Sequence, residues 1–219
     1  MGLGRSGIGA AELLNAEGHR VIVLESGESP TYKTQAERLK SKGIQVALGK
    51  PLELSSFQPW LNQLTSVVIS PAVPWGHSTL NELRQKGVTV TGEINLAWER
   101  LKHLPWIGIT GTNGKSTTCK IIEKILKVAN HNVKTVGNIG NPILYSSRTK
   151  KKYIYILEVS SYQLEYSKLF RAKHAAILNI SPDHLERHKN FKNYVSTKFK
   201  LFKNQKKGDY SFFNFNNLH

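Results

Sequence analysis

Short apolar runs alternate with amphipathic segments in the first part of the chain. The spacing predicts a helix over residues 8–17, which Gly18 ends, and a buried strand over 20–24. This is a βαβ unit without its first strand. Further elements follow the same logic: a polar helix over 35–42, strands over 44–48, 66–70 and 88–90, and a helix over 94–101. Pro71 and Pro74 break the chain between two of these strands.

The second part of the chain has the same alternation with longer apolar runs. We expect strands over residues 106–110, 153–159 and 175–180, and helices over 115–129, from Tyr162 onward and, long and basic, through Tyr194 and Phe199. The predicted buried stripe of the first of these helices consists of Ile121, Ile122, Ile125, Leu126 and Ala129. Strands that alternate with helices indicate an open, mostly parallel α/β sheet.

The chain is long enough for two modest domains, since it has 219 residues of which 39% are hydrophobic. We place the boundary between Gly92 and Pro105. The expected domains are a Rossmann-like domain over residues 1–93 and a second α/β domain over 94–219.

Composition favours a cytoplasmic protein without membrane insertion, and we expect a monomer. Cys119 is the single cysteine, so the chain forms no intrachain disulfide. No apolar run approaches the roughly 20 residues that span a bilayer, and the N-terminus lacks the pattern of a signal peptide. The first six residues match an N-myristoylation pattern, but their glycines fit a phosphate loop better.

The net charge of +16 raises the question of nucleic-acid binding. Lysines gather at residues 150–152 and 198–207, without the stacking aromatics or reading motif of a nucleic-acid module. Solvated basic faces are therefore the favoured interpretation, and we expect no nucleic-acid partner. A basic P-loop protein that binds nucleic acid stays an alternative.

The strongest candidate site lies between an apolar strand and an amphipathic helix. It is a phosphate loop followed by hydroxyl residues: Gly111, Thr112, Asn113, Gly114, Lys115, Ser116 and Thr117. Backbone N–H groups at the helix N-terminus favour phosphate, Lys115 would reach the outer phosphates, and the Ser116 hydroxyl would ligate Mg²⁺. The strict P-loop pattern has glycine where this chain has Ile109.

A second glycine loop opens the chain. The spacing Gly2, Gly4, Gly7, followed by a helix, a strand and Glu25, is typical of a dinucleotide or nucleotide-sugar site. A tight turn with close helix packing is the simpler alternative. The pattern does not distinguish NAD from UDP.

Two acidic positions follow predicted strands of the second domain. Glu158 interrupts the end of an apolar strand, where an unpaired buried carboxylate is costly, and we interpret it as a magnesium ligand. Asp183 and His184 follow another strand and would complete that site. An exposed edge glutamate and a surface histidine are the plain alternatives.

Together these motifs resemble the Mur ligases. The 110–116 loop is similar to the family's ATP loop, the 137–140 segment to its substrate-contacting segment, and Asp183-His184 to its Asp-His pair. Residues 194–198 resemble the segment that bears a carboxylated lysine. The most specific match is the run over 158–165, which resembles the branch that adds D-glutamate.

The resemblance implies an ATP-dependent ligase of peptidoglycan synthesis that adds D-glutamate to UDP-N-acetylmuramoyl-L-alanine through an acyl phosphate. It implies catalytic roles for Lys115, Glu158, His184 and Lys198, with Ser116, Glu158, His184 and carboxylated Lys198 holding Mg²⁺. The implied substrate contacts are Arg5, Ser6, Glu25, Ser26, Asn138, Ser160 and Tyr162.

The chain departs from the family at both ends. It begins inside the first phosphate loop, and family members continue to a third domain, so we expect a fragment. Another Mur ligase, a folylpolyglutamate synthase-like enzyme and a non-catalytic nucleotide-binding remnant are the other interpretations.

Overall fold

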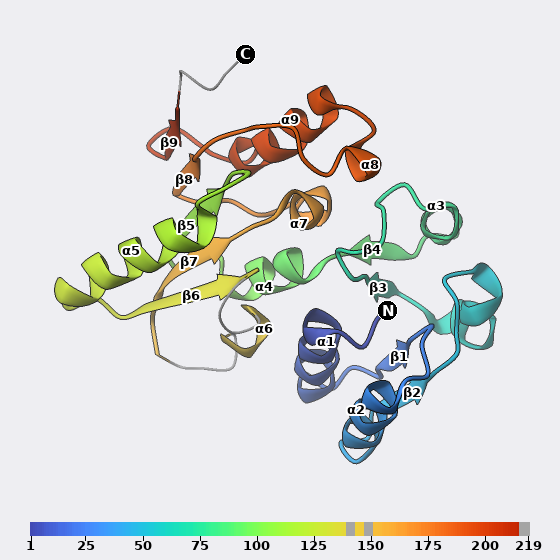
Figure 1. The fold of residues 1–219 in the computed structure, drawn as a ribbon. Helices are drawn as coiled ribbons and strands as arrows, with labels where there is room; N and C mark the ends of the chain where they lie inside the picture. The colour runs from blue at the N-terminus through green and yellow to red at the C-terminus, as the bar shows by residue number, and fades with distance from the viewer. Residues whose placement is uncertain (139–142, 147–150, 215–219) are drawn as a thin grey trace. The chain divides into compact units, whose positions relative to one another are not determined.

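The computed structural model describes residues 1–138, 143–146 and 151–214, in two compact units, Met1–Leu96 and Ala97–His219. Figure 1 shows the elements of both units along the chain. Ile139 and Gly140 of the predicted substrate-contacting segment lie outside the described residues. No described helix has the length and apolar character needed to cross a membrane.

The first unit contains two pairs of parallel strands. Strand β1 (Ile22–Leu24) pairs with β2 (Gln45–Ala47), and β3 (Ser66–Val68) pairs with β4 (Thr89–Thr91). The helices of the unit are α1 (Arg5–Ala16), α2 (Pro30–Lys40), the 3-10 helix η1 (Leu54–Gln63) and α3 (Ser78–Gln85). Helix α4 (Glu93–Leu101) follows β4 and runs across the division of the chain.

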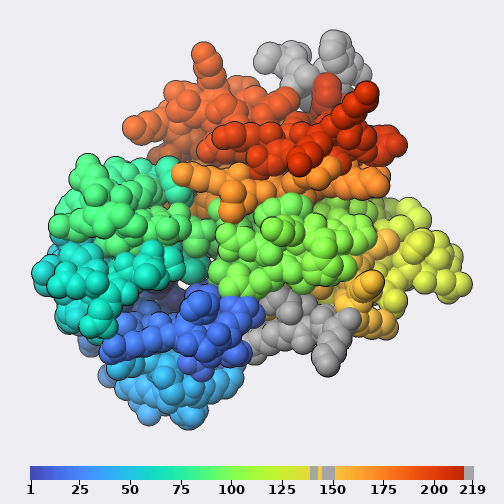
Figure 2. Space-filling view, turned by 180° about the vertical axis from the view of Figure 1, so that it is seen from behind, coloured from blue at the N-terminus to red at the C-terminus, as the bar shows by residue number. Residues whose placement is uncertain are grey.

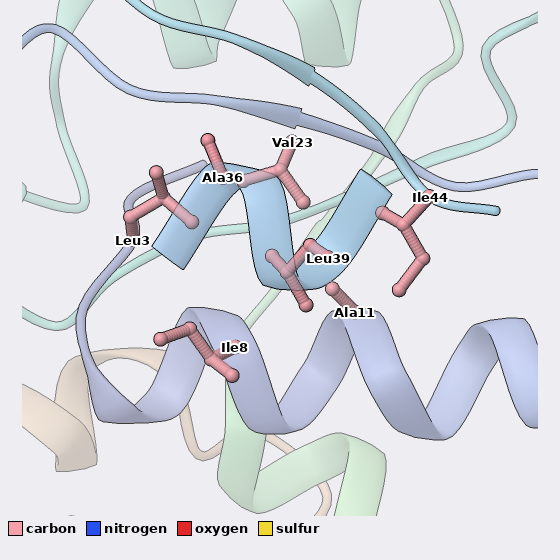
Figure 3. Packing of buried hydrophobic residues seen from close by; sticks show 7 residues of the cluster. All are labelled: Leu3, Ile8, Ala11, Val23, Ala36, Leu39 and Ile44. Atoms are coloured by element: carbon pink, nitrogen blue, oxygen red, sulfur yellow. The ribbon is translucent and has the colours of Figure 1, made fainter. Parts of the chain in front are cut away.

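Helices α1 and α2 pack against β1 and β2 in the core of the first unit. Leu39 and Ile44 are almost fully buried there. Helix α2 has a capped start, because the side chain of Ser29, the residue before Pro30, accepts a hydrogen bond from the Tyr32 N–H. Figure 3 shows the apolar side chains of this core, which come from the opening loop, both helices, β1 and the residue just before β2: Leu3, Ile8, Ala11, Val23, Ala36, Leu39 and Ile44.

The second unit is built on a five-stranded parallel sheet with the order β6-β7-β5-β8-β9. Its strands are β5 (Trp106–Thr110), β6 (Val133–Gly137), β7 (Ile154–Glu158), β8 (His174–Ile177) and β9 (Tyr210–Phe213). Its helices are α5 (Lys115–Val128), α6 (Ile143–Ser146), α7 (Ser161–Tyr166), α8 (Leu185–His188), α9 (Phe191–Phe199) and the 3-10 helix η2 (Lys200–Phe202). The parallel α/β architecture expected from the sequence is confirmed.

The predicted buried stripe of α5 is wrong in part. Ile121 and Ile125 are 55% and 61% exposed, while Cys119, at 0%, Ile122 and Leu126 form the face that packs on the sheet. The register of the helix turns the two isoleucines away because Cys119 lies against Ile109 and Ile156. The end of α5 and the start of β6, in yellow, project at the edge of this unit in Figure 2.

Other differences concern short or polar elements. The expected long basic helix ends after nine residues at Phe199 and continues as the 3-10 turn η2. The strand expected over 175–180 ends at Ile177, which leaves Leu178 to Ser181 free to run beside the phosphate loop. The sequence pattern predicted no element at the polar helix α3, at β6 or at β9.

Candidate functional site

The phosphate loop lies at the carboxyl end of β5, the central strand of the second unit's sheet, and leads into α5. Gly114 is the N-cap of α5, with φ of +80° and no side-chain cap. A left-handed φ suits glycine, and a helix start without a side-chain cap leaves its first N–H groups available for an anion. The loop thus has the conformation that a phosphate site requires.

Lys115 and Ser116 occupy the first turn of α5. The Lys115 ammonium donates to the carbonyls of Gly111 (2.9 Å) and Thr112 (2.8 Å), so the loop itself holds this side chain. The Ser116 hydroxyl donates to Glu158 Oε2 at 2.8 Å. Thr117, the third hydroxyl residue of the motif, is exposed.

Glu158 ends β7, beside Ile109 of β5, and is only 1% exposed. Its carboxylate accepts hydrogen bonds from the Ser116 hydroxyl and from Asn138 Nδ2 (3.0 Å), and the Asn138 N–H donates to the Glu158 carbonyl (3.0 Å). Both donors that reach the carboxylate from the described residues are neutral. A buried carboxylate with neutral partners, next to a serine hydroxyl, is a donor set of the hard oxygen type that Mg²⁺ prefers.

Lys198 reaches the phosphate loop from α9. Its side chain is 2% exposed, and its ammonium donates to the Gly111 carbonyl at 2.9 Å. Burial and, secondly, the nearby charge of Lys115 lower the pKa of Lys198 to about 8, against an opposing effect of Asp183. A neutral amine is therefore accessible near physiological pH.

His184 makes its direct contacts with residues of its own segment and with Tyr162 of α7. It is the left-handed N-cap of α8, with φ of 52°, and its ring contacts Asp183 (3.4 Å) and the Tyr162 hydroxyl (3.3 Å). Among the described residues its contacts also reach Glu186, but not Glu158 or Lys198. No group of three or more His, Cys, Asp or Glu side chains gathers in a metal-binding cluster in the described part of the chain.

Helix α7 follows Glu158 and is tied to α8. Ser160 caps α7 in a capping box with Gln163, so the predicted substrate residue already has a structural role. The Glu165 carboxylate of α7 accepts hydrogen bonds from Nε and Nη2 of Arg187 of α8, the shortest of which is 2.8 Å. Tyr162 lies under the Arg187 guanidinium, 4.7 Å from it, and so also joins the two helices.

The glycine loop of the first unit is organised around Glu25. The Glu25 carboxylate accepts from the N–H groups of Leu3 (2.7 Å) and Gly27 (3.0 Å) and from the Ser26 hydroxyl (3.2 Å). Burial raises the Glu25 pKa, but the hydrogen bonds from Gly27 and Leu3 outweigh this effect and the net pKa is lowered. Glu25 therefore holds the loop, whereas the sequence pattern suggested a contact with the ligand.

Other contacts place the opening residues between the two strand pairs of this unit. Gly2 donates to the Leu24 carbonyl at 2.8 Å, and Ser70 donates to the Met1 carbonyl at 3.2 Å. A Cβ on Gly7 would lie 1.9 Å from the Gly2 carbonyl oxygen, so the close approach requires glycine there. Arg5 and Ser6 form the first turn of α1 just after this loop.

Two residues contact the phosphate loop although no chemical role was predicted for them from the sequence. The Tyr194 hydroxyl, on α9, lies 3.1 Å from the Thr112 hydroxyl, and its ring lies 4.6 Å from the Lys198 ammonium. Asn179, just after β8, contacts the backbone of Asn113. The position of Asn179 at a strand end was a usable signal, but nothing in the sequence showed what it would face.

Comparison with known proteins gives matches over both units. The model of the Mur ligase middle domain matches residues 109–219, and that of the "Mur ligase MurD-like, N-terminal domain" matches residues 1–92. A UDP-N-acetylmuramoylalanine--D-glutamate ligase from Parasynechococcus marenigrum is 44% identical over 98% of this chain and 47% of its own length. A protein of the same name from Synechococcus sp. (strain CC9902) is 44% identical over 92% of this chain and 45% of its own length. The chain thus spans about half the length of these relatives.

Solved structures give the same fold. A UDP-N-acetylmuramate:L-alanyl-gamma-D-glutamyl-meso-diaminopimelate ligase from Neisseria meningitides has a TM-score of 0.60 at 16% identity, covering 97% of this chain and 68% of that one. A UDP-N-acetylmuramate-alanine ligase from Thermotoga maritima has a TM-score of 0.52 at 22% identity, covering 92% of this chain and 46% of that one. At these identities the likeness concerns the fold alone.

Proposed function

The chain belongs to the Mur ligase family, and we propose that it provides the UDP-substrate and ATP sites of a ligase that adds D-glutamate to UDP-N-acetylmuramoyl-L-alanine. The named relatives at 44% identity support this choice of substrates. A reaction that consumes ATP and a UDP-linked precursor fits a cytoplasmic location. We further propose that the chain acts as a monomer.

The observation that carries the proposal is the meeting of Ser116 and Glu158 beside Lys115. The hydroxyl at the start of α5 and the carboxylate at the end of β7 are 2.8 Å apart. They lie at the carboxyl ends of the strands, where ligands of parallel α/β proteins bind. These two side chains would hold Mg²⁺, which when bound would offset the negative charge of the ATP phosphates. Lys115 would leave the loop carbonyls and pair with the outer phosphate oxygens.

Lys198 is proposed to act as a carbamate. The Lys198 ammonium would first lose one proton, and the neutral amine would then attack carbon dioxide, form a C–N bond and release a second proton. The two steps together convert a buried cation into a buried anion. The nearby Lys115 ammonium would stabilise that anion, since opposite charges attract strongly in a buried site. His184 is proposed to act beside the Lys198 carbamate, in the position that its contacts with Tyr162 and Asp183 give it.

The reaction needs two displacements. The γ-phosphoryl group of ATP would pass to the substrate carboxylate and leave ADP. The amine of D-glutamate would then attack the acyl phosphate, lose a proton and release inorganic phosphate. Lys115 and the N–H groups of α5 would stabilise the charge on the transferred group and hold it in place. Ser160, Tyr162 and Asn138 are proposed to contact the substrate. Arg5, Ser6 and Ser26 are proposed to contact the UDP-sugar in the first unit, and Glu25 to contribute to that site by holding its glycine loop.

A chimeric enzyme tests the choice of substrates. Residues 1–219 would replace the matching half of the Parasynechococcus marenigrum ligase, and the chimera would be offered D-glutamate, L-lysine, meso-diaminopimelate or folate with the corresponding acceptors. We expect ADP release and a new amide with D-glutamate and UDP-N-acetylmuramoyl-L-alanine only. Product with another amino acid would indicate a different ligase of the family. A folded chimera that binds both substrates and forms no product would favour the non-catalytic interpretation.

A further inference from the structure

We infer that Asn179 is the positioning residue that sets the conformation of the phosphate loop and thereby selects which of its N–H groups bind phosphate. The inference rests on the proposed nucleotide site, because it assigns a function to the shape of that loop. Asn179 has no role in the chemistry proposed above. It lies two residues beyond Ile177, where β8 ends, and it is partly buried.

The Asn179 side chain closes a two-point hydrogen-bonded pair with the backbone of Asn113. Its Oδ1 accepts from the Asn113 N–H at 2.9 Å, and its Nδ2 donates to the Asn113 carbonyl at 3.1 Å. A side-chain amide that satisfies both groups of one residue acts as a strand neighbour would, over a distance of 66 residues in sequence. This contact fixes the orientation of the peptide groups at the tip of the loop.

The backbone on either side of Asn179 completes the attachment. The Asn179 carbonyl accepts from the Thr112 N–H at 3.0 Å, and the Ser181 N–H donates to the Thr112 hydroxyl at 3.0 Å. The approach is close, since a Cβ on Gly111 would lie 3.2 Å from the Leu178 Cβ. The loop therefore rests on the segment after β8 at successive residues.

The attachment divides the N–H groups of the loop into two sets. The N–H groups of Thr112 and Asn113 already donate to Asn179 and so are not available to a ligand. Helix α5 begins at Lys115 and its first internal N–H bond runs from Thr118 to the Gly114 carbonyl, so the N–H groups of Lys115, Ser116 and Thr117 have no partner within the helix. The phosphates would bind this second set. Asn179 keeps the set accessible, because its hydrogen bonds hold Thr112 and Asn113 against the segment after β8.

Asn204 offers a matched control in the same unit. Its Nδ2 also donates to backbone carbonyls, those of Lys168 (2.8 Å) and Phe170 (2.9 Å), but these belong to the segment between α7 and β8 and not to the phosphate loop. Asn204→Ala and Asn179→Ala therefore both remove an asparagine that holds backbone. A purely structural role predicts similar effects on stability and none on the nucleotide site.

The test combines two measurements on the 219-residue chain. Calorimetric titration with Mg²⁺-ATP gives nucleotide affinity, and amide hydrogen exchange gives the protection of the Asn113 N–H without any ligand. For Asn179→Ala we expect about tenfold weaker Mg²⁺-ATP binding, because two hydrogen bonds that preorganise the loop are lost, together with faster exchange at Asn113. Asn204→Ala should change neither. Asn179→Asp keeps the acceptor and should keep the Asn113 N–H protected.

The outcomes separate this inference from the proposed function. If the wild-type chain binds no nucleotide while Asn179→Ala alone loses protection at Asn113, the positioning role stands and the proposed nucleotide site fails. If the wild type binds Mg²⁺-ATP, but Asn179→Ala matches Asn204→Ala in affinity and in exchange, the inference is overturned. Should Asn179→Ala fail to fold, the Asn179→Asp variant decides: an unprotected Asn113 N–H in that variant would also overturn the inference.

Discussion

The Lys198 ammonium donates a hydrogen bond to the Gly111 carbonyl, 2.9 Å away, and so joins α9 to the phosphate loop across 87 positions in sequence. The same carbonyl accepts from Lys115 at 2.9 Å. Two ammonium groups on one oxygen repel each other, which favours the neutral form of the more buried one. The charged form of Lys198 therefore lowers the stability of the folded state. The same destabilisation favours the neutral amine, which is the form that reacts with carbon dioxide.

The first prediction concerns the pH dependence of that destabilisation. The pKa of Lys198 is lowered from 10.5 to about 8, so between these values the unfolded state binds more protons and stability rises with pH. The destabilisation of the folded state by the buried ammonium is fully present below pH 8 and is lost as the pH rises toward 10.5. In buffer free of carbon dioxide, Lys198→Met should gain more stability over wild type at pH 7 than at pH 10, by about 2 kcal/mol. Urea unfolding measures this, and an equal difference at both pH values would contradict it.

The second prediction concerns carbon dioxide itself. Thorough removal of bicarbonate should lower the activity of the chimeric ligase, because the carbamate of Lys198 would revert to the amine. Short carboxylic acids should partly restore activity to Lys198→Ala, since they supply a carboxylate in the emptied space. A mass spectrum of active, magnesium-bound enzyme with unmodified Lys198 would rule out the carbamate.

The third prediction concerns Glu158. Glu158→Gln retains the shape of the side chain and removes a buried charge whose donors from the described residues are neutral, so we expect the stability to be unchanged or higher. Mg²⁺ should then no longer strengthen ATP binding. Glu123→Gln is the control, because Glu123 of the same unit also accepts from a hydroxyl, that of Thr135 at 2.8 Å. A full magnesium response in Glu158→Gln would exclude Glu158 as a ligand.

The fourth prediction concerns acid stability. Arg171 donates two hydrogen bonds to the Asp209 carboxylate, at 2.6 and 2.8 Å, and these lower the Asp209 pKa to about 2. A depressed carboxyl pKa stabilises the folded state above the ordinary value of 3.8, and that contribution is lost as the pH falls toward 2. Asp209→Asn should therefore be less stable than wild type at pH 7 and approach it near pH 2. A gap in stability that persists at pH 2 would show that the ion pair is not its cause.

The parts of the fold that the sequence predicted well have strong local signals. Strand Trp106–Thr110 has the predicted bounds, because a continuous apolar run ends abruptly at the glycine loop. Helix α5 begins at the predicted residue, because Gly114 marks its start. The family resemblance, which rested on these motifs, is confirmed by the family models.

The parts that were missed depend on tertiary contacts. Helix α3 has a mostly polar sequence whose buried residues include Leu80 and Leu83, so its periodicity is weak. The buried face of α5 is decided by Cys119, a small residue that the apolar pattern did not count. Glu25 met the spacing rule for a ligand contact, yet its carboxylate binds the loop backbone, which only the folded structure reveals.

We expect the phosphate loop of this chain to bind Mg²⁺-ATP through Lys115, and calorimetric titration of the wild-type chain and of Lys115→Ala measures that contribution. Lys115 donates to carbonyls of its own loop, so we expect Lys115→Ala to keep the fold of the unit while it deprives the phosphates of their cationic partner. We expect the wild type to bind and Lys115→Ala to bind at least tenfold more weakly, since hydrogen bonds to charged groups contribute about 1.5–3 kcal/mol. Binding of the UDP substrate should be the same in both. Equal affinity of the two proteins for Mg²⁺-ATP would contradict the account.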